Sequence, residues 1–129
     1  MIWDAARWPN FSQDEFACKG TGRCEMDPAF MDKLQELRDL YGKPMAITSG
    51  FRAPEYNAKV SGTGTTGPHT TGRACDVAVA GADAYLLAQL AFKMNFMGIG
   101  MSQKGPKRFI HLDMCLPPEF PRPALWSYP

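Results

Sequence analysis

The hydrophobic periodicity changes along the chain, and this change constrains the fold more than any other feature. Phe30, Leu34, Leu37 and Tyr41 recur at the 3.6-residue spacing that places side chains on one face of a helix. Further along the chain, apolar and β-branched residues fall in short runs that favour strands. Helices first and short strands afterwards predict an α+β fold with a small, largely antiparallel sheet.

Turn and capping residues divide the chain into these elements. Ser12 and Glu15 form a capping box at the start of a first helix, and Gly42 ends the second one. The other expected elements are strands over residues 45–49, 74–79, 98–101 and 108–114, a short helix from about residue 54, a glycine-rich loop over 61–68, a helix over 86–95 and a proline-rich tail. Neither a repeat nor a linker separates them, so residues 1–129 are predicted to form one domain.

The charge balance excludes two classes of partner. Lys and Arg total 14 against 13 Asp and Glu, and this net charge of +1 predicts neither nucleic-acid binding nor attraction to an anionic membrane. The chain lacks an apolar run of about eighteen residues, and its first residues lack the basic and apolar regions of a signal peptide. We therefore expect a chain without a membrane span or a signal peptide, and we expect it to be a monomer.

The four cysteines give weak support for a disulfide framework. Cys18 and Cys24 are separated by five residues, which is wider than the spacing of a zinc knuckle. Metal or disulfide use of this pair stays open at this point. Cys75 and Cys115 are interpreted as small buried hydrophobic residues.

The chain has two histidines, and a carboxylate follows each of them closely, Asp76 after His69 and Asp113 after His111. Catalytic zinc takes three protein ligands and keeps a fourth position open, so His69, Asp76 and His111 would suffice. Residues two apart on a strand face the same side, so His111 and Asp113 are expected to point into one cleft. The alternative is a loop histidine and a core histidine without any metal.

Two segments resemble a known family of peptidases. Residues 67–76 read Gly-Pro-His-Thr-Thr-Gly-Arg-Ala-Cys-Asp, and a histidine follows inside the predicted strand at residues 109–113. This pattern resembles the Ser-x-His-x-x-Gly-x-Ala-x-Asp motif of zinc D-alanyl-D-alanine carboxypeptidases and phage L-alanyl-D-glutamate endopeptidases, which have a hedgehog-like fold. Residues 49–57, which read Ser-Gly-Phe-Arg-Ala-Pro-Glu-Tyr-Asn, resemble the Ser-Gly-Tyr-Arg-Ser element of that family. The resemblance covers roughly residues 12–115.

The resemblance implies roles for particular residues. It makes His69, Asp76 and His111 the ligands of one zinc ion, and it places Arg52, with Ser49 nearby, against the substrate. A guanidinium can bind a carboxylate through two parallel hydrogen bonds and can stabilise an oxyanion. The implied reaction is hydrolysis of a peptide bond in the stem peptide of bacterial peptidoglycan, by a carboxypeptidase or an endopeptidase.

Two positions depart from the family pattern. Gly67 stands in place of the motif serine, and Arg108 stands where some relatives carry a glutamate that acts as general base. Arg108 cannot accept a proton. Asp113 is therefore the candidate for the base, and its alternative role is to orient the imidazole of His111.

The missing glutamate also leaves a second function open. A zinc-bearing domain without catalysis, which binds cell wall or forms part of a virion, would keep the metal and lose the hydrolysis. The resemblance to phage enzymes implies synthesis in the cytoplasm of an infected bacterium, or assembly into a virion, with action in the cell wall or periplasm.

Overall fold

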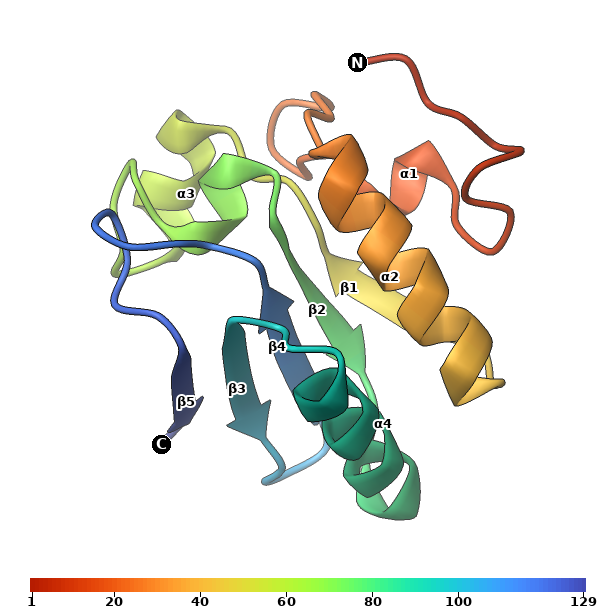
Figure 1. Cartoon of the computed structure of the whole chain (residues 1–129). Coiled ribbons are helices and arrows are strands. Elements are labelled where there is room, and N and C mark those ends of the chain that lie inside the picture. Colours follow the sequence, from red (N-terminus) through yellow and green to blue (C-terminus); the bar gives the residue numbers. More distant parts are fainter.

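One five-stranded sheet organises the chain, which the computed structural model describes over residues 1–129 (Figure 1). The strands are β1 (Ala46–Ser49), β2 (Ala74–Ala78), β3 (Gly98–Ser102), β4 (Phe109–Asp113) and β5 (Ala124–Ser127). The helices are α1 (Gln13–Phe16), α2 (Pro28–Tyr41), α3 (Pro54–Val60) and α4 (Gly81–Lys93), with a short 3-10 helix η1 (Pro68–Thr71). The spatial order is β1-β2-β4-β3-β5, and only the β3 and β5 pair is parallel. The predicted α+β class with a largely antiparallel sheet is confirmed.

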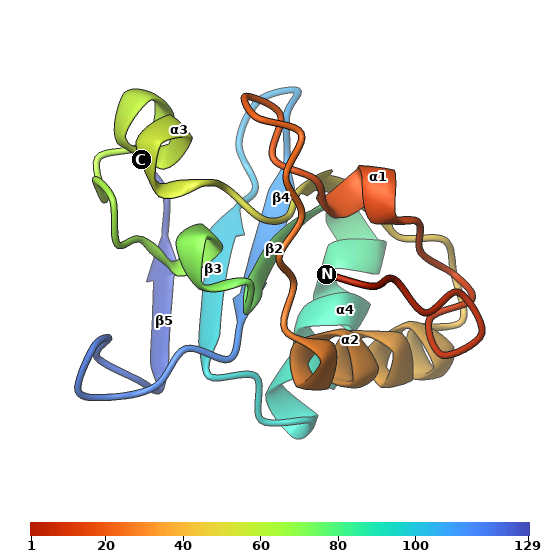
Figure 2. The same ribbon diagram turned by 90° about the horizontal axis from the view of Figure 1, so that it is seen from above.

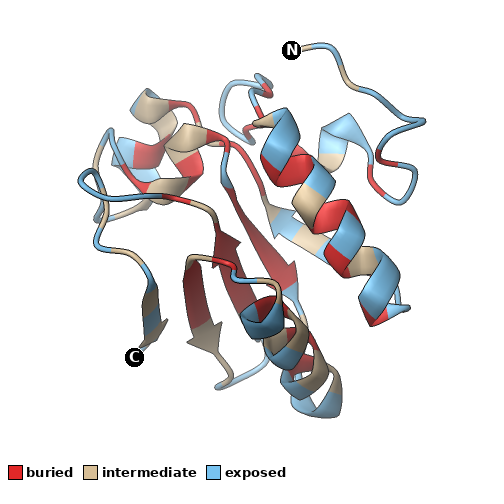
Figure 3. Ribbon diagram, viewed as in Figure 1, coloured by how far each residue is buried: buried red, intermediate tan, exposed pale blue.

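The two faces of the sheet have different environments, because side chains alternate along each strand. On one face, five side chains of β2, β3 and β4 are at most 1% exposed: Cys75, Val77, Ile99, Ile110 and Leu112. Helices α2 and α4 lie on this side of the sheet, and their buried residues join the same hydrophobic core (Figures 2 and 3). The polar residues of β2 and β4, which are Asp76, His111 and Asp113, lie on the opposite face.

The predicted start of α1 and end of α2 agree with the structure, whereas α4 begins at Gly81, five residues before the predicted start of that helix. The backbone N–H of Ser12 donates a hydrogen bond to Glu15 Oε1 at 2.8 Å, and the rings of Phe11 and Phe16 lie 5.5 Å apart as a hydrophobic staple. Gly42 ends α2 in the left-handed region at φ 70°. None of the four α-helices has the length and apolar character needed to cross a membrane.

One row of residues crosses all five strands on the polar face. Ser49 lies opposite Asp76, and Asp76 lies opposite His111. His111 lies opposite Gly100, which in turn lies opposite Trp126. Directly opposed residues share a face of the sheet, so this register places Asp76 and His111 side by side. A Cβ atom at Gly100 would overlap the Trp126 indole, so glycine lets this ring approach the strand closely.

Two elements were not predicted from the sequence. The proline-rich tail, for which no strand was predicted, contains β5, and the segment before residue 72 contains η1. Strand β5 has an exposed residue at Leu125 and pairs with β3, which lies far from it in the sequence. Local periodicity carries no signal for such a pairing.

All four cysteines are buried free thiols. Cys18 and Cys24 therefore do not form a disulfide, and the Cys18 sulfur accepts a hydrogen bond from the backbone N–H of Ala53 at 3.3 Å. Cys75 is fully buried in the core, and Cys115 is 2% exposed. The interpretation of Cys75 and Cys115 as buried residues is confirmed.

We predict that Gly72→Ala destabilises the fold. Gly72 ends η1 at φ 75°, and a Cβ atom there would overlap the carbonyl oxygen of Glu25. An alanine in the left-handed region is strained, and its Cβ atom would displace the backbone at Glu25. Together these effects should lower the free energy of unfolding by about 2–4 kcal/mol, measured by urea denaturation. In the control Gly62→Ala the added Cβ meets open space, and the change should stay within about 0.5 kcal/mol. Equal unfolding midpoints for the two variants would contradict the prediction.

Candidate metal centre

Three buried side chains meet on the polar face of the sheet. His69 comes from η1, Asp76 from β2 and His111 from β4, and they are 6%, 8% and 2% exposed. Asp76 Oδ1 lies 3.4 Å from His69 Nε2 and 3.1 Å from His111 Nδ1. The potential ligand atoms all lie within 4.8 Å of one another. Tetrahedral ligands about 2.0–2.2 Å from zinc are separated by about 3.4 Å, so the cluster fits one zinc ion.

The second nitrogen of each imidazole also has a partner. His69 Nδ1 lies 2.8 Å from the carbonyl oxygen of Gly50, and His111 Nε2 lies 2.7 Å from Asp113 Oδ2. When these two nitrogens donate to their acceptors, His69 Nε2 and His111 Nδ1 keep their lone pairs facing Asp76. This is the protonation that metal-binding imidazoles need, and it is a second respect in which the residues fit a metal.

The loop after β1 holds His69 in place. The backbone N–H of Arg52 donates to the carbonyl oxygen of His69 at 3.0 Å, which adds to the bond between His69 and Gly50. The N–H of Phe51 donates to the carbonyl oxygen of Phe16 at 2.8 Å, and a Cβ atom at Gly50 would overlap the Phe16 backbone. The Gly50 carbonyl was not predicted as a partner of His69, although the Ser-Gly-Phe-Arg segment had been singled out.

Hydrogen bonds keep both carboxylates ionised. Burial alone would raise the pKa of Asp76, but hydrogen bonds from His111 and His69 hold it well below its usual range. Burial opposes ionisation of Asp113 as well, but hydrogen bonds from His111 and Arg122 lower its pKa to about 2. Burial would lower the pKa of His111, but hydrogen bonds to Asp113 and Asp76 raise it above the usual value. The ionised Asp76 therefore places a negative charge where a cation would bind.

Asp113 lies behind His111 and away from the cleft. Its side chain is fully buried, and Oδ2 contacts the His111 nitrogen that faces away from Asp76. Arg122 donates to Oδ1 from Nε at 3.0 Å and to Oδ2 from Nη2 at 2.8 Å, and the N–H of Cys115 donates to Oδ1 at 3.1 Å. Of the two roles that the sequence left open for Asp113, these contacts favour orientation of His111.

Arg122 is a residue that sequence reasoning missed. Its side chain is 6% exposed, and its guanidinium carbon lies 5.1 Å from the centre of the Trp126 ring and 5.4 Å from that of Phe120. The Trp126 ring in turn lies 5.1 Å from the His111 ring. The tail therefore packs against a candidate ligand, and Trp126 both fastens the tail and lines a cavity. The only signal in the sequence was that Arg122 is the one basic residue after Asp113.

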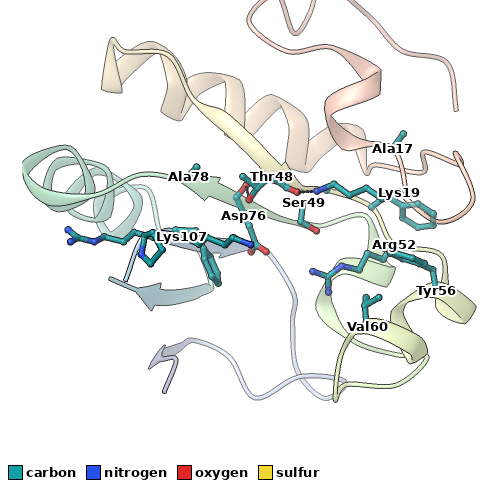
Figure 4. A pocket seen from close by; sticks show the side chains of 15 residues that line it. Ala17, Lys19, Thr48, Ser49, Arg52, Tyr56, Val60, Asp76, Ala78 and Lys107 are labelled. Carbon is teal, nitrogen blue, oxygen red and sulfur yellow. Dashed lines mark hydrogen bonds between the residues drawn. The ribbon is translucent and has the colours of Figure 1, made fainter. Parts of the chain in front are cut away.

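Two cavities open on either side of Asp76. The larger, of about 580 Å³, is lined by residues that include Ser49, Arg52 and Lys107 (Figure 4). The smaller, of about 340 Å³, is lined by both histidines and by Trp126 and Tyr128, among others. The two share four lining residues: Arg52, Val60, Asp76 and Phe109. Ser49 and Arg52, predicted to face the substrate, thus line the cleft beside the metal centre.

A buried asparagine orients Arg52. Asn57 is fully buried, and its Oδ1 accepts a hydrogen bond from Arg52 Nη1 at 3.2 Å. Asn57 Nδ2 donates to Thr63 Oγ1 at 2.9 Å, which anchors the amide. A Cβ atom at Gly67 would overlap the Thr63 hydroxyl, so the serine expected there would displace this network. Neither the role of Asn57 nor the need for glycine at position 67 was predicted from the sequence. Both depend on contacts between α3 and the glycine-rich loop over residues 61–68.

A buried His-Asp-His cluster beside an open cleft is the arrangement of a mononuclear metalloenzyme. The sequence profile of the family described as Peptidase M15 matches residues 9–113. The chain belongs to this family of zinc-dependent metallopeptidases. No curated protein sequence matches the chain as a relative. Arg122 and Trp126 lie outside the matched segment.

We predict that Arg122→Met weakens zinc binding without removing a ligand. Loss of the guanidinium leaves Asp113 free to move, and His111 loses its fixed orientation. Partners of metal-bound histidines are typically worth about 10–100-fold in metal affinity, and competition with a chromogenic chelator would measure the loss. Arg122→Lys should give an intermediate loss, since an ammonium keeps the charge but not the paired hydrogen bonds. Arg23→Met, at an exposed site, is the control, and equal affinities in all four proteins would refute the role.

We also predict that the stabilisation by zinc grows with pH between 6 and 8. The raised pKa of His111 stabilises the metal-free protein at pH values below the unfolded value near 6.5, and this contribution is lost as the pH rises through the folded pKa. Zinc must displace the same proton, so its apparent affinity should fall with falling pH. Thermal unfolding with zinc and with a chelator at pH 6, 7 and 8 would test this. A zinc-induced shift that is independent of pH would speak against His111 as a ligand.

Proposed function

We propose that the chain is a zinc-dependent endopeptidase that hydrolyses a peptide bond in the stem peptide of bacterial peptidoglycan. The observation that carries the proposal is the convergence of His69, Asp76 and His111 at the base of a cleft. Membership of the peptidase M15 family supports the reaction class. The resemblance to wall-cleaving relatives around both histidines supports the substrate.

The residues of the cleft would have separate roles in the reaction. His69 Nε2, His111 Nδ1 and a carboxylate oxygen of Asp76 would hold the metal. When bound, zinc supplies a Lewis acid for the peptide carbonyl and an activated water near neutral pH. Arg52, held by Asn57, would orient the substrate carbonyl and stabilise the negative charge that develops on its oxygen.

The residues of the cleft do not include a separate carboxylate base. Asp76 is the only acidic residue that lines either cavity, and its pKa lies well below the usual range. Arg108, at the position of the glutamate in some relatives, donates through Nε to the carbonyl oxygen of Gly105. We therefore propose that Asp113, with Arg122 behind it, positions His111 and does not transfer the proton.

The shape of the cleft favours cleavage within a chain over removal of a terminal residue. Space extends from Asp76 in two directions, into the cavities of about 580 Å³ and 340 Å³. A peptide lying across Asp76 can continue on both sides of the bond that is cut. Such a substrate would place the site of action in the cell wall or periplasm, after synthesis in an infected host or within a virion.

We predict that the zinc-loaded protein releases new amino termini from purified peptidoglycan, detected by mass spectrometry of the products. His69→Ala and Asp76→Asn should lower the rate by at least about a thousandfold, because each removes a ligand. Asp83→Asn, an exposed substitution, should keep the rate of the parent protein.

Asp113→Asn separates the two roles considered for this residue. Weaker zinc binding together with a loss of about 10–100-fold in rate would support positioning of His111. Normal zinc binding with complete loss of hydrolysis would instead make Asp113 the base. A parent protein that binds zinc and wall but hydrolyses no wall substrate would be the non-catalytic domain, and the endopeptidase proposal would be wrong.

A further inference from the structure

The C-terminal tail supplies part of the wall of the smaller cavity. Trp126 and Tyr128 line this cavity together with all three candidate metal ligands. Strand β5 pairs with β3, and the backbone N–H of Tyr128 donates to the carbonyl oxygen of Met101 at 3.0 Å, which fixes the end of the tail (Figure 1). Both aromatic residues lie beyond residue 113, where the family match ends. A role of Tyr128 in the site therefore does not follow from family membership.

Neighbouring rings hold the phenol of Tyr128 on the polar face of the sheet. Trp126 and Tyr128 are two residues apart in extended chain, so their side chains point to the same side. The Tyr128 ring lies 5.1 Å from the Phe109 ring and 6.5 Å from the Trp126 ring. The Trp126 ring in turn lies 5.1 Å from the His111 ring. Aromatic packing therefore sets the phenol in the wall beside the metal centre.

The hydroxyl group of Tyr128 keeps its hydrogen available for a ligand. Burial raises the pKa of Tyr128 above its usual value, although a hydrogen bond with the Trp126 side chain opposes this effect. An indole can only donate, so the Tyr128 oxygen accepts this bond. The charges of Asp76 and Arg52 also act on the pKa of the hydroxyl, as expected for a group that faces the same cavity. The phenol is therefore protonated near neutral pH and can donate to a substrate.

The other hydroxyl groups of the cavity belong to a network within the glycine-rich loop. Ser61 Oγ and Thr63 Oγ1 lie 2.9 Å apart, and Thr63 Oγ1 also accepts a hydrogen bond from Asn57 Nδ2. Arg52 joins this network through its bond to Asn57 Oδ1. Tyr128 is the one hydroxyl-bearing residue of the cavity outside the network. It faces the metal centre from the tail, whereas Arg52 comes from the segment after β1.

We propose that Tyr128 is a catalytic residue whose hydroxyl group donates a hydrogen bond to the carbonyl oxygen of the peptide bond that is cut. This oxygen gains negative charge when the carbonyl carbon is attacked, and a donor already held in place stabilises that charge more than it stabilises the substrate. Arg52 would donate to the same oxygen from the wall that both cavities share. The phenol keeps its proton throughout. This inference rests on the proposed function, because it adds a residue to the same reaction.

Tyr128→Phe tests the donor, because it removes the hydroxyl group and keeps the ring. In the zinc-loaded protein, kcat for a stem peptide should fall about a hundredfold, as for the loss of one oxyanion donor. KM should stay within about threefold, because the bond is made mainly in the transition state. Zinc affinity and the unfolding midpoint should equal those of the parent protein. The control Tyr85→Phe removes the hydroxyl group of a tyrosine on α4 that is 77% exposed, and it should leave kcat unchanged.

Two kinetic results would contradict the inference. One is a kcat of Tyr128→Phe equal to that of the parent protein. The other is a loss of rate together with an equal loss of zinc affinity, which would assign Tyr128 to support of the metal centre.

Binding of a phosphinic peptide separates this inference from the proposed function. Its tetrahedral, negatively charged phosphinate resembles the transition state and is not hydrolysed. The zinc-loaded parent protein should bind this peptide about a hundredfold more tightly than Tyr128→Phe does, measured by fluorescence anisotropy. Such a difference in a parent protein that hydrolyses no wall substrate would support the donor and refute the endopeptidase. Equal affinity of the two proteins for the phosphinic peptide would overturn the donor, whatever the rate of hydrolysis.

Discussion

The antiparallel pairing of β2 with β4 is the constraint on which the rest of the site depends. It sets Asp76 opposite His111, so two of the three candidate ligands are placed by backbone hydrogen bonds and not by a flexible loop. A slip of one residue would turn one of the two side chains to the other face. The hydrophobic face prevents such a slip, because the apolar residues of the shifted strand, Cys75 and Val77 in β2 or Ile110 in β4, would then leave the core. The apolar packing of the sheet against α2 and α4 therefore fixes the strand register, and this register positions the metal centre on the opposite face.

His69, the third candidate ligand, and the partners that hold the two imidazoles lie outside the ladder between Asp76 and His111. They nevertheless depend on its register. His69 is held by the carbonyl oxygen of Gly50, and Gly50 packs against the backbone of Phe16 in α1. On the other side, His111 is held by Asp113, and Asp113 by Arg122 from the tail. Removing one member of a buried ion pair typically costs about 3–5 kcal/mol, because the remaining charge is left without a partner. Two segments distant from the sheet centre, α1 and the tail, thus fix the directions of the two imidazoles.

The metal centre borders two adjoining cavities. The metal centre lies where the two cavities meet, and Arg52 and Asp76 belong to both. Trp126 and Tyr128 line the smaller cavity. Their position depends on the parallel pairing of β5 with β3, which brings the tail beside His111. The C-terminal segment therefore contributes to the wall of the cleft as well as to support of the metal centre.

The sequence by itself determined the fold class, most element positions and the residues singled out as ligands. Helical spacing, capping residues and short β-branched runs are local signals, and two histidines with nearby carboxylates left few alternatives for a zinc site. The tertiary structure alone decided that Asp113 lies behind His111, that Arg122 holds Asp113, and that Asn57 holds Arg52. These contacts depend on side-chain direction and on pairing between distant segments, as in β5 with β3. Local propensity contains no information about such pairing, because the free energy that decides it comes from burial and hydrogen bonding in the folded chain.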